Sequence, residues 1–222
     1  MEKIKLVLET RHFIYSLLQH VWSNQPTEEQ LLQWKERLPY EFLREVSASG
    51  GKDIQIFFES LTCNSIYETA GKEREEYNRL FYTPGNQAVP MWESTYVTNE
   101  KLLFDFPTIK VREMLKKYGF EYIHIGKEPE DHISVELDFM DKLIEKSLEA
   151  VSNHDEIDFR RHMKGQKIFL ENHLTKWIGP LATNIMDSTS SLYYKGFAKL
   201  LSDVIYEDSQ LVNETLEAME EC

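Results

Sequence analysis

Apolar residues recur at intervals of three and four positions along most of the chain. This spacing places side chains on one face of an α-helix, whereas a half-buried β-strand alternates apolar and polar residues. The members of the first such stripe are Ile4, Val7, Leu8, Ile14, Tyr15, Leu18, Val21 and Trp22. The pattern predicts an all-α fold of about nine to eleven helices in a single globular domain over residues 1–222.

Local signals predict the ends of the first two helices. Pro26 stops the first helix. Thr27 and Gln30 then form a capping box, in which each side chain satisfies a free backbone N–H at the start of the second helix. Pro39 ends that second helix, because a proline cannot continue the helical hydrogen-bond pattern.

Later boundaries are expected at glycine, threonine and aspartate residues. Gly50-Gly51 is expected to form a turn, and Asp53 to cap the helix that follows. Thr108 is expected to cap a further helix, for which Gly119 is a natural C-terminal stop.

Prolines suggest three further features of the second half. We expect Pro129 to be the first residue of the helix with the most regular apolar stripe. A later helix is expected from about Phe159 to Trp177, with Gly179-Pro180 breaking it. The acidic tail, residues 207–222, has six acidic residues and no lysine or arginine, so it is expected to be a solvated helix or a frayed end.

Two segments lack the helical pattern. Residues 83–96, TPGNQAVPMWESTY, are rich in turn formers and are interpreted as a long loop, which in a compact domain is often functional. Residues 119–132 form a second irregular segment, in which only the short EYIHI stretch is an ambiguous strand. We expect a hinge near residues 119–131, which allows a monomer or a domain-swapped dimer.

Charge narrows the choice of partner. The chain has 38 acidic and 25 basic residues, which give a net charge of −13. Nucleic-acid-binding proteins carry basic patches, so we expect no nucleic-acid partner. An acidic surface instead accelerates encounters with a cationic partner.

The sequence shows no targeting signal. Glu2, Glu9 and Arg11 interrupt the N-terminal apolar residues, so the continuous run of a signal peptide is missing. No stretch has the length of a membrane span. Cys63 and Cys222 form no disulfide framework, which suits a reducing compartment. We therefore expect a cytoplasmic protein without stable membrane insertion.

Motifs for catalysis are missing from the sequence. No G-x-x-x-x-G-K-[ST], G-x-G-x-x-G or G-x-S-x-G is found, so we expect no enzyme. Two Glu-x-x-His spacings, Glu9 to His12 and Glu121 to His124, match part of the helical di-iron pattern. Among so many glutamates we interpret them as chance and expect no metal and no cofactor, with a helical di-metal enzyme as the less favoured alternative.

Two polar clusters have open interpretations. Acids within residues 128–132 complement the dipole of the helix that follows, yet His132 and Glu136 also lie one turn apart and suit a polar site. Trp92 and Tyr96 are either core anchors or the wall of a peptide groove, where aromatic rings offer contact area at little entropic cost.

Three stretches carry a combined pattern. They are Tyr77-x-x-Leu80-Phe81-x-x-Pro84-Gly85, Pro90-x-Trp92-Glu93-Ser94-x-Tyr96 and Glu128-Pro129-x-Asp131-His132-Ile133-x-x-Glu136-Leu137-x-Phe139-Met140. Their order and intervals resemble the TorD/DmsD family of redox-enzyme maturation chaperones, and FLENHLTKW (169–177) resembles its C-terminal helical segment. The resemblance covers residues 77–178, whereas the first 76 residues match only in being helical.

The resemblance implies an all-α chaperone that binds the twin-arginine leader of a molybdopterin oxidoreductase of the dimethyl-sulfoxide or trimethylamine-oxide reductase class. Such a chaperone holds the body of the molybdenum reductase until its cofactor is inserted, which prevents early export. The implied peptide site is Trp92, Glu93, Ser94, Tyr96, Asp131 and His132. Further expected members are Phe81, Pro90, Glu128, Pro129 and Glu136.

The leader has two parts that the site must recognise. Its apolar stretch is expected along a groove walled by Trp92, Tyr96 and Phe81. Its arginine pair is expected at carboxylates such as Glu93 and Asp131, because the guanidinium fork engages a carboxylate through two hydrogen bonds. The alternative is an assembly chaperone for a redox subunit that is not exported, as in the related nitrate-reductase assembly proteins.

Overall fold

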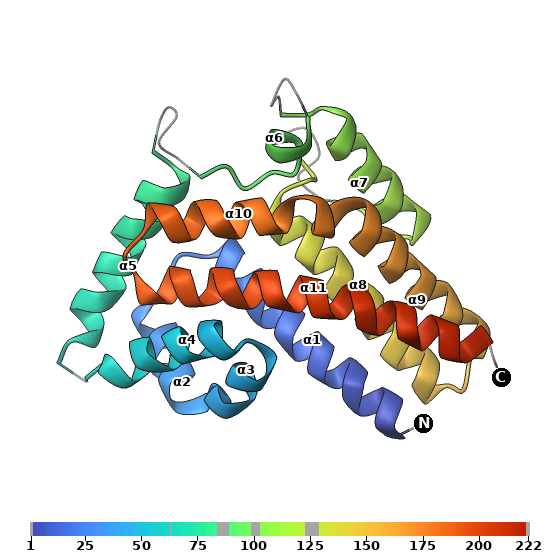
Figure 1. Cartoon of the computed structure of the whole chain (residues 1–222), viewed down its shortest axis with the longest axis horizontal. Helices are drawn as coiled ribbons and strands as arrows, with labels where there is room; N and C mark the ends of the chain where they lie inside the picture. The colour runs from blue at the N-terminus through green and yellow to red at the C-terminus, as the bar shows by residue number, and fades with distance from the viewer. Residues whose placement is uncertain (1, 63, 84–88, 99–102, 123–128, 221–222) are drawn as a thin grey trace. The chain divides into compact units, whose positions relative to one another are not determined.

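The computed structural model describes residues 2–62, 64–83, 89–98, 103–122 and 129–220. These residues form eleven α-helices and one π-helical turn without a β-sheet, so the all-α prediction is confirmed (Figure 1). The elements up to residue 97 are α1 (Glu2–Ser23), α2 (Glu28–Arg37), α3 (Tyr40–Val46), α4 (Ala48–Ser60), α5 (Ile66–Phe81) and α6 (Ser94–Val97). Those that follow are α7 (Phe106–Lys117), α8 (Ile133–Ser152), α9 (Glu156–Phe169), the π-helical turn η1 (Leu170–Leu174), α10 (Thr175–Ser188) and α11 (Leu192–Glu220).

The chain divides into two compact units, each assembled from stretches that are distant in sequence. The first unit comprises residues 1–22, 92–177 and 205–222, and the second comprises residues 23–91 and 178–204. The single domain expected over residues 1–222 stays a prediction. In the described part of the chain, no helix has both the length and the apolar character that a membrane crossing needs.

Two helix ends that depend on local chemistry are confirmed. At α2, the Gln30 N–H donates to Thr27 Oγ1 over 3.1 Å, and the Thr27 N–H donates to Gln30 Oε1 over 3.4 Å. After α7, Gly119 has a φ of 80°, which favours glycine. This turn lets the Phe120 N–H reach the Leu115 carbonyl over 2.9 Å, the bond that closes a Schellman motif.

The expected turn at Gly50-Gly51 is wrong, because both glycines lie inside α4. Ser47 caps this helix, and Asp53 lies within it, paired with Lys199 over 2.5 Å. A Cβ atom on Gly50 would lie 2.8 Å from the carbonyl oxygen of Gly196. The glycine therefore permits the close approach of α4 and α11, a tertiary requirement that resembles a turn signal in the sequence.

Two expected helix starts are wrong by a few residues. Thr108 lies inside α7, whose N-cap is Asp105. Pro129 precedes α8 rather than opening it, and the N-cap is His132, which accepts a hydrogen bond from the Ser134 N–H over 3.2 Å. The backbone of residues 129–132 is used instead to approach the segment around residue 93, as described below.

The expected break at Gly179-Pro180 is also wrong, because α10 continues through both residues. The fully buried Leu181 and Ile185 follow directly, and their burial offsets the hydrogen bond that a proline removes from a helix. The possible hinge near residues 119–131 stays a prediction, because residues 123–128 lie outside the described part.

The acidic tail is helical but is not fully solvated. Asp208 and Leu216 on α11 are both only 5% exposed. Arg11 on α1 donates to both oxygens of Asp208, over 2.5 and 2.9 Å, and the Tyr15 hydroxyl donates to the same carboxylate over 2.7 Å. The first turns of the chain and its last helix are therefore joined within the first unit by a buried ion pair.

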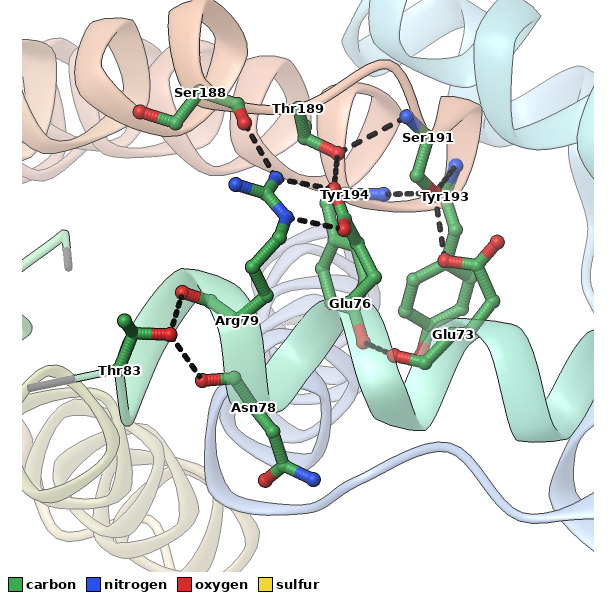
Figure 2. A network of polar contacts seen from close by, with 10 residues as sticks. All are labelled: Glu73, Glu76, Asn78, Arg79, Thr83, Ser188, Thr189, Ser191, Tyr193 and Tyr194. Atoms are coloured by element: carbon green, nitrogen blue, oxygen red, sulfur yellow. Dashed lines mark hydrogen bonds and ion pairs between the residues drawn. The ribbon is translucent and has the colours of Figure 1, made fainter. Parts of the chain in front are cut away.

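A polar network in the second unit holds the segment between α10 and α11 against α5 (Figure 2). Glu73 accepts a hydrogen bond from the Ser191 hydroxyl over 2.7 Å, and Glu76 accepts one from Thr189. Arg79 donates to both oxygens of Glu76 over 2.7 and 2.6 Å. Burial raises the pKa of Glu73, whereas the hydrogen bond from Arg79 lowers the pKa of Glu76.

Candidate functional site

Asp131 holds together three segments of the predicted site. Its carbonyl oxygen accepts from the Glu93 N–H over 2.9 Å, and its Oδ2 accepts from the Ser94 N–H over 2.8 Å. Its Oδ1 accepts from the Thr108 hydroxyl of α7 over 2.6 Å. Asp131 is 0% exposed. The carboxylate therefore ties the Trp92–Ser94 turn to α7 and to the residues that precede α8, and its direct contact with a peptide stays a prediction.

Trp92 and His132 lie side by side next to this carboxylate. Their backbones form an isolated antiparallel bridge, and their rings meet edge to face with centroids 5.2 Å apart. His132 is 8% exposed, and its Nδ1 lies 2.7 Å from the Ser134 hydroxyl. The indole nitrogen of Trp92 is buried and has no hydrogen-bond acceptor among the described residues.

Glu130 has a different role from the helix-dipole role considered for it. It is fully buried, and Arg112 of α7 donates to both of its oxygens over 2.6 and 2.9 Å. The residues before α8 thus contact α7 through both Glu130 and Asp131. These two acids fix the entrance of α8 against α7, which positions His132.

A buried cluster of ionisable groups lies beside the turn. His173 Nδ1 lies 2.8 Å from Glu93 Oε2, and the Trp177 indole N–H donates to Glu136 Oε2 over 3.0 Å. Glu136 is 0% exposed, and its Oε1 has no hydrogen-bond partner among the described residues. Burial raises the pKa of Glu136 well above its ordinary value, and the nearby charge of Glu93 adds to this effect.

The π-helical turn η1 carries His173 into this cluster. π-helical turns interrupt α-helices and are frequent at functional sites. The His173 ring stacks on Phe169, with centroids 4.7 Å apart and an interplanar angle of 27°. The Trp177 ring lies 5.5 Å from that of Tyr96 in α6. Sequence reasoning assigned no role to His173 or Trp177, and the only signal for them was their place in the FLENHLTKW stretch.

A groove of about 550 Å³ opens onto Glu93 and His173. Its walls carry apolar side chains, of which Phe106 is 62% and Val97 is 42% exposed. The complete lining is Glu93, Val97, Phe106, Pro107, Lys110, Glu113, Met114, Lys117, Ile168, Asn172, His173 and Lys176. The groove therefore combines an apolar wall, a lysine-bearing rim and a buried carboxylate, all within the first unit.

The other expected site residues lie in several places. Phe81 and Pro90 belong to the second unit, where the Phe81 ring packs on Tyr77 with centroids 4.9 Å apart. Pro129 is buried before α8, and Glu128 lies outside the described residues. The structure therefore brings together Trp92, Glu93, Ser94, Tyr96, Asp131, His132 and Glu136 within the first unit.

The two Glu-x-x-His spacings do not form a site in the described residues. His12 pairs with Asp141 over 2.7 Å, and Glu9 lies 3.8 Å from Lys5 on the surface of α1. His124 lies outside the described residues.

Comparison with known proteins identifies the family. The model of the family described as nitrate reductase delta subunit matches residues 65–183, which is more than half of the chain. The chain belongs to this TorD-like family. The resemblance to the TorD/DmsD family is thereby confirmed.

Relatives named chaperone protein TorD match over half of the chain or more. The protein from Vibrio vulnificus (strain YJ016) is 25% identical over 210 residues, which cover 90% of this chain and 94% of the relative. That from Vibrio cholerae serotype O1 (strain ATCC 39541 / Classical Ogawa 395 / O395) is 22% identical over 222 residues, 98% of each chain. That from Photobacterium profundum is 33% identical over 119 residues, 54% of this chain and 53% of the relative.

The family match contains the site. Residues 65–183 include the Trp92–Ser94 turn, Asp131 and His132, and both His173 and Trp177. The α1 and C-terminal α11 segments of this TorD-like chain lie outside the matched range, although they form part of the first unit.

Proposed function

We propose that this chain is a cytoplasmic chaperone that binds the twin-arginine leader of a molybdopterin oxidoreductase and holds the precursor until its cofactor is inserted. The chaperone name of the TorD relatives supports a binding role rather than catalysis. The observation that carries the proposal is the groove of about 550 Å³, which has an apolar wall and ends at the carboxylate of Glu93. Grooves of this kind bind amphipathic peptide segments.

The apolar stretch of the leader fits the exposed wall. Val97 and Phe106 line the groove, and Leu103, Phe104 and Ile109 from the same part of the chain are each more than 40% exposed. Exposed apolar side chains that cluster beside a groove mark binding surfaces.

We expect negative charge to attract the arginine pair, but this charge does not come from the lysine-bearing rim of the groove. Lys110, Lys117 and Lys176 line the rim, so the attraction comes from Glu93 and from the net charge of −13. Glu93 pairs with His173 through its Oε2. Its other oxygen gives a guanidinium group a carboxylate to approach from the groove.

A titration of fluorescent leader peptide tests the proposal. Phe106→Ala should weaken binding about tenfold, because truncation of an anchor in an interface typically costs more than about 1 kcal/mol. This loss should persist at high salt. Tyr67→Ala is the matched control, because Tyr67 is an exposed aromatic residue (72%) in the second unit. Equal losses for the two variants, or none for Phe106→Ala, would remove the groove from the site.

Glu93→Gln tests the electrostatic part. It should weaken binding of a leader with an intact arginine pair, and the difference from the native chain should narrow as salt screens the charges. A leader with two lysines in place of the pair should bind less tightly to the native chain, since a point charge lacks the two-bond fork. If Glu93→Gln weakens binding of both leaders equally, the Glu93 carboxylate does not recognise the arginine pair.

A second function is favoured by the description of the matched family. That description is nitrate reductase delta subunit, which suits an assembly chaperone for a redox subunit that is not exported. Such a chaperone binds its client without a twin-arginine motif. A pull-down with leaders from molybdenum reductases, with and without the motif, separates the two functions, because only leader binding requires the arginine pair.

A further inference from the structure

One buried cluster in the first unit joins the Glu93 carboxylate of the groove to Glu136, a residue that leader binding does not use. Glu93, Glu136 and His173 each offer one ligand atom, and these three atoms lie within 4.8 Å of one another. All three residues are buried, with exposures of 3%, 0% and 5%. They come from three separate parts of the chain: the Trp92–Ser94 turn, α8 and η1. The fold therefore gathers two carboxylates and one imidazole at a single point.

One oxygen atom of this cluster, on Glu136, lacks a hydrogen-bond partner among the described residues. Glu136 Oε2 accepts from the Trp177 indole N–H, whereas the fully buried Oε1 has no partner among the described residues. A buried carboxylate oxygen without a partner costs free energy that a proton or a cation can offset. The unpartnered oxygen is an observation separate from the clustering of the acids, and a bound proton or a cation would satisfy it.

We propose that Glu93, Glu136 and His173 form a binding site for a divalent transition-metal ion of the zinc type. Two carboxylates and one neutral imidazole balance the charge of such an ion and supply oxygen and nitrogen ligands. An imidazole ligand favours zinc, copper, iron or nickel over magnesium, calcium or manganese, which prefer oxygen. The proposal does not depend on leader binding.

The surroundings have the features that a metal site requires. The Trp177 N–H fixes the Glu136 carboxylate, and the Phe169 ring stacks on His173, so both ligands are held from behind. Glu93 and His173 line the groove, which gives an ion a route to the cluster. In the alternative arrangement a proton shared by Glu93 and Glu136 offsets one of their two negative charges.

A cobalt titration of the chelator-treated full chain tests the site. Co²⁺ has visible absorption bands that report its coordination, and Zn²⁺ should displace it. We expect one equivalent of Co²⁺ per chain, a melting temperature that rises with the metal, and an affinity at least about tenfold weaker in Glu136→Gln. The glutamine keeps an oxygen for the Trp177 N–H and the volume of the side chain, so folding is preserved. Trp177→Phe should also weaken metal binding by about tenfold, because it removes the hydrogen bond that positions Glu136.

His12→Ala is the matched control, because His12 belongs to a surface histidine–carboxylate pair with Asp141. It should leave the cobalt spectrum and affinity unchanged. No stoichiometric Co²⁺ or Zn²⁺ binding, or equal binding by the native chain and Glu136→Gln, would overturn the proposal in favour of the shared proton. Glu136→Gln should keep its affinity for the leader, since Glu136 does not line the groove. Failure of metal binding is therefore distinct from failure of leader binding.

Discussion

Asp131→Asn separates support of the site from contact with the leader. Asparagine can direct its oxygen to the Ser94 N–H and its amide to the Thr108 hydroxyl, which then accepts instead of donating. The variant therefore still forms two hydrogen bonds, but neither of them has a charged acceptor. Hydrogen bonds to charged groups contribute about 1.5–3 kcal/mol, against about 0.5–1.5 kcal/mol for neutral ones. We therefore expect a loss of about 2 kcal/mol in the free energy of unfolding.

This loss corresponds to a melting temperature lower by about 4–8 °C in a chain of this size. Thermal unfolding followed by circular dichroism measures it. The control is Asp138→Asn on α8, whose carboxylate is 45% exposed and pairs with Lys142; it should change stability by no more than about 0.5 kcal/mol. Leader affinity, measured well below the melting temperature, should stay within about twofold of native, because Asp131 is sealed from solvent.

Two results would refute this reasoning. An unchanged melting temperature in Asp131→Asn would mean that the hydrogen bonds to Ser94 and Thr108 do not support the site. A salt-dependent loss of leader affinity, with native stability, would place the Asp131 carboxylate in contact with the arginine pair as the sequence first suggested.

Three further predictions concern packing, burial of charge and pH. Gly50→Ala should destabilise the chain by about 1–3 kcal/mol, because the new Cβ atom would lie 2.8 Å from backbone atoms. Gly71→Ala should instead stabilise the chain by about 0.5–1 kcal/mol, because the space around Gly71 is open. Chemical denaturation measures both free energies of unfolding, and equal effects would contradict the packing argument. Arg11→Met should lower the free energy of unfolding by about 3–5 kcal/mol, because it leaves the Asp208 charge buried without its cationic partner. The double variant Arg11→Met/Asp208→Asn should recover part of that loss. No recovery would argue against a charge effect. The pKa of Glu73 is raised in the folded chain, so protonation of Glu73 favours folding. The native chain should therefore lose stability relative to Glu73→Gln as the pH rises from about 4.5 through the folded pKa. Parallel pH profiles of the two melting temperatures would exclude this linkage.

Helix ends were predictable where neighbouring residues alone determine them. The capping box of Thr27 and Gln30 is closed by residues three apart, and Gly119 adopts the left-handed backbone that ends α7. The turn prediction at Gly50-Gly51 was wrong because Gly50 permits the close approach of α4 and α11, and no local sequence pattern reveals such a tertiary contact. Pro180 misled for a related reason, since buried neighbours keep α10 helical around it.

The site was predictable in part. Trp92 and His132 were identified from a resemblance, and the structure brings their rings together. His173 was missed because its contribution depends on the π-helical turn at Leu170–Leu174, for which the sequence gives no periodicity signal. The partners of Asp131 were missed because Ser94 and Thr108 lie 37 and 23 residues away, and only the tertiary fold makes them neighbours.

The order in which the chain is made has a consequence for its N-terminal helix. Arg11 and Asp208 are 197 residues apart, and the first unit needs both residues 1–22 and residues 205–222. Synthesis proceeds from the N-terminus at about 5–20 residues per second, so α1 waits about ten seconds or more for its partner. During that interval Leu8 of α1, which lines one pocket of the first unit together with Leu211 of α11, lacks this part of its surroundings. A ribosome-bound chain stopped before residue 205 is therefore expected to be protease-sensitive in α1, because the buried pair of Arg11 and Asp208 cannot yet form.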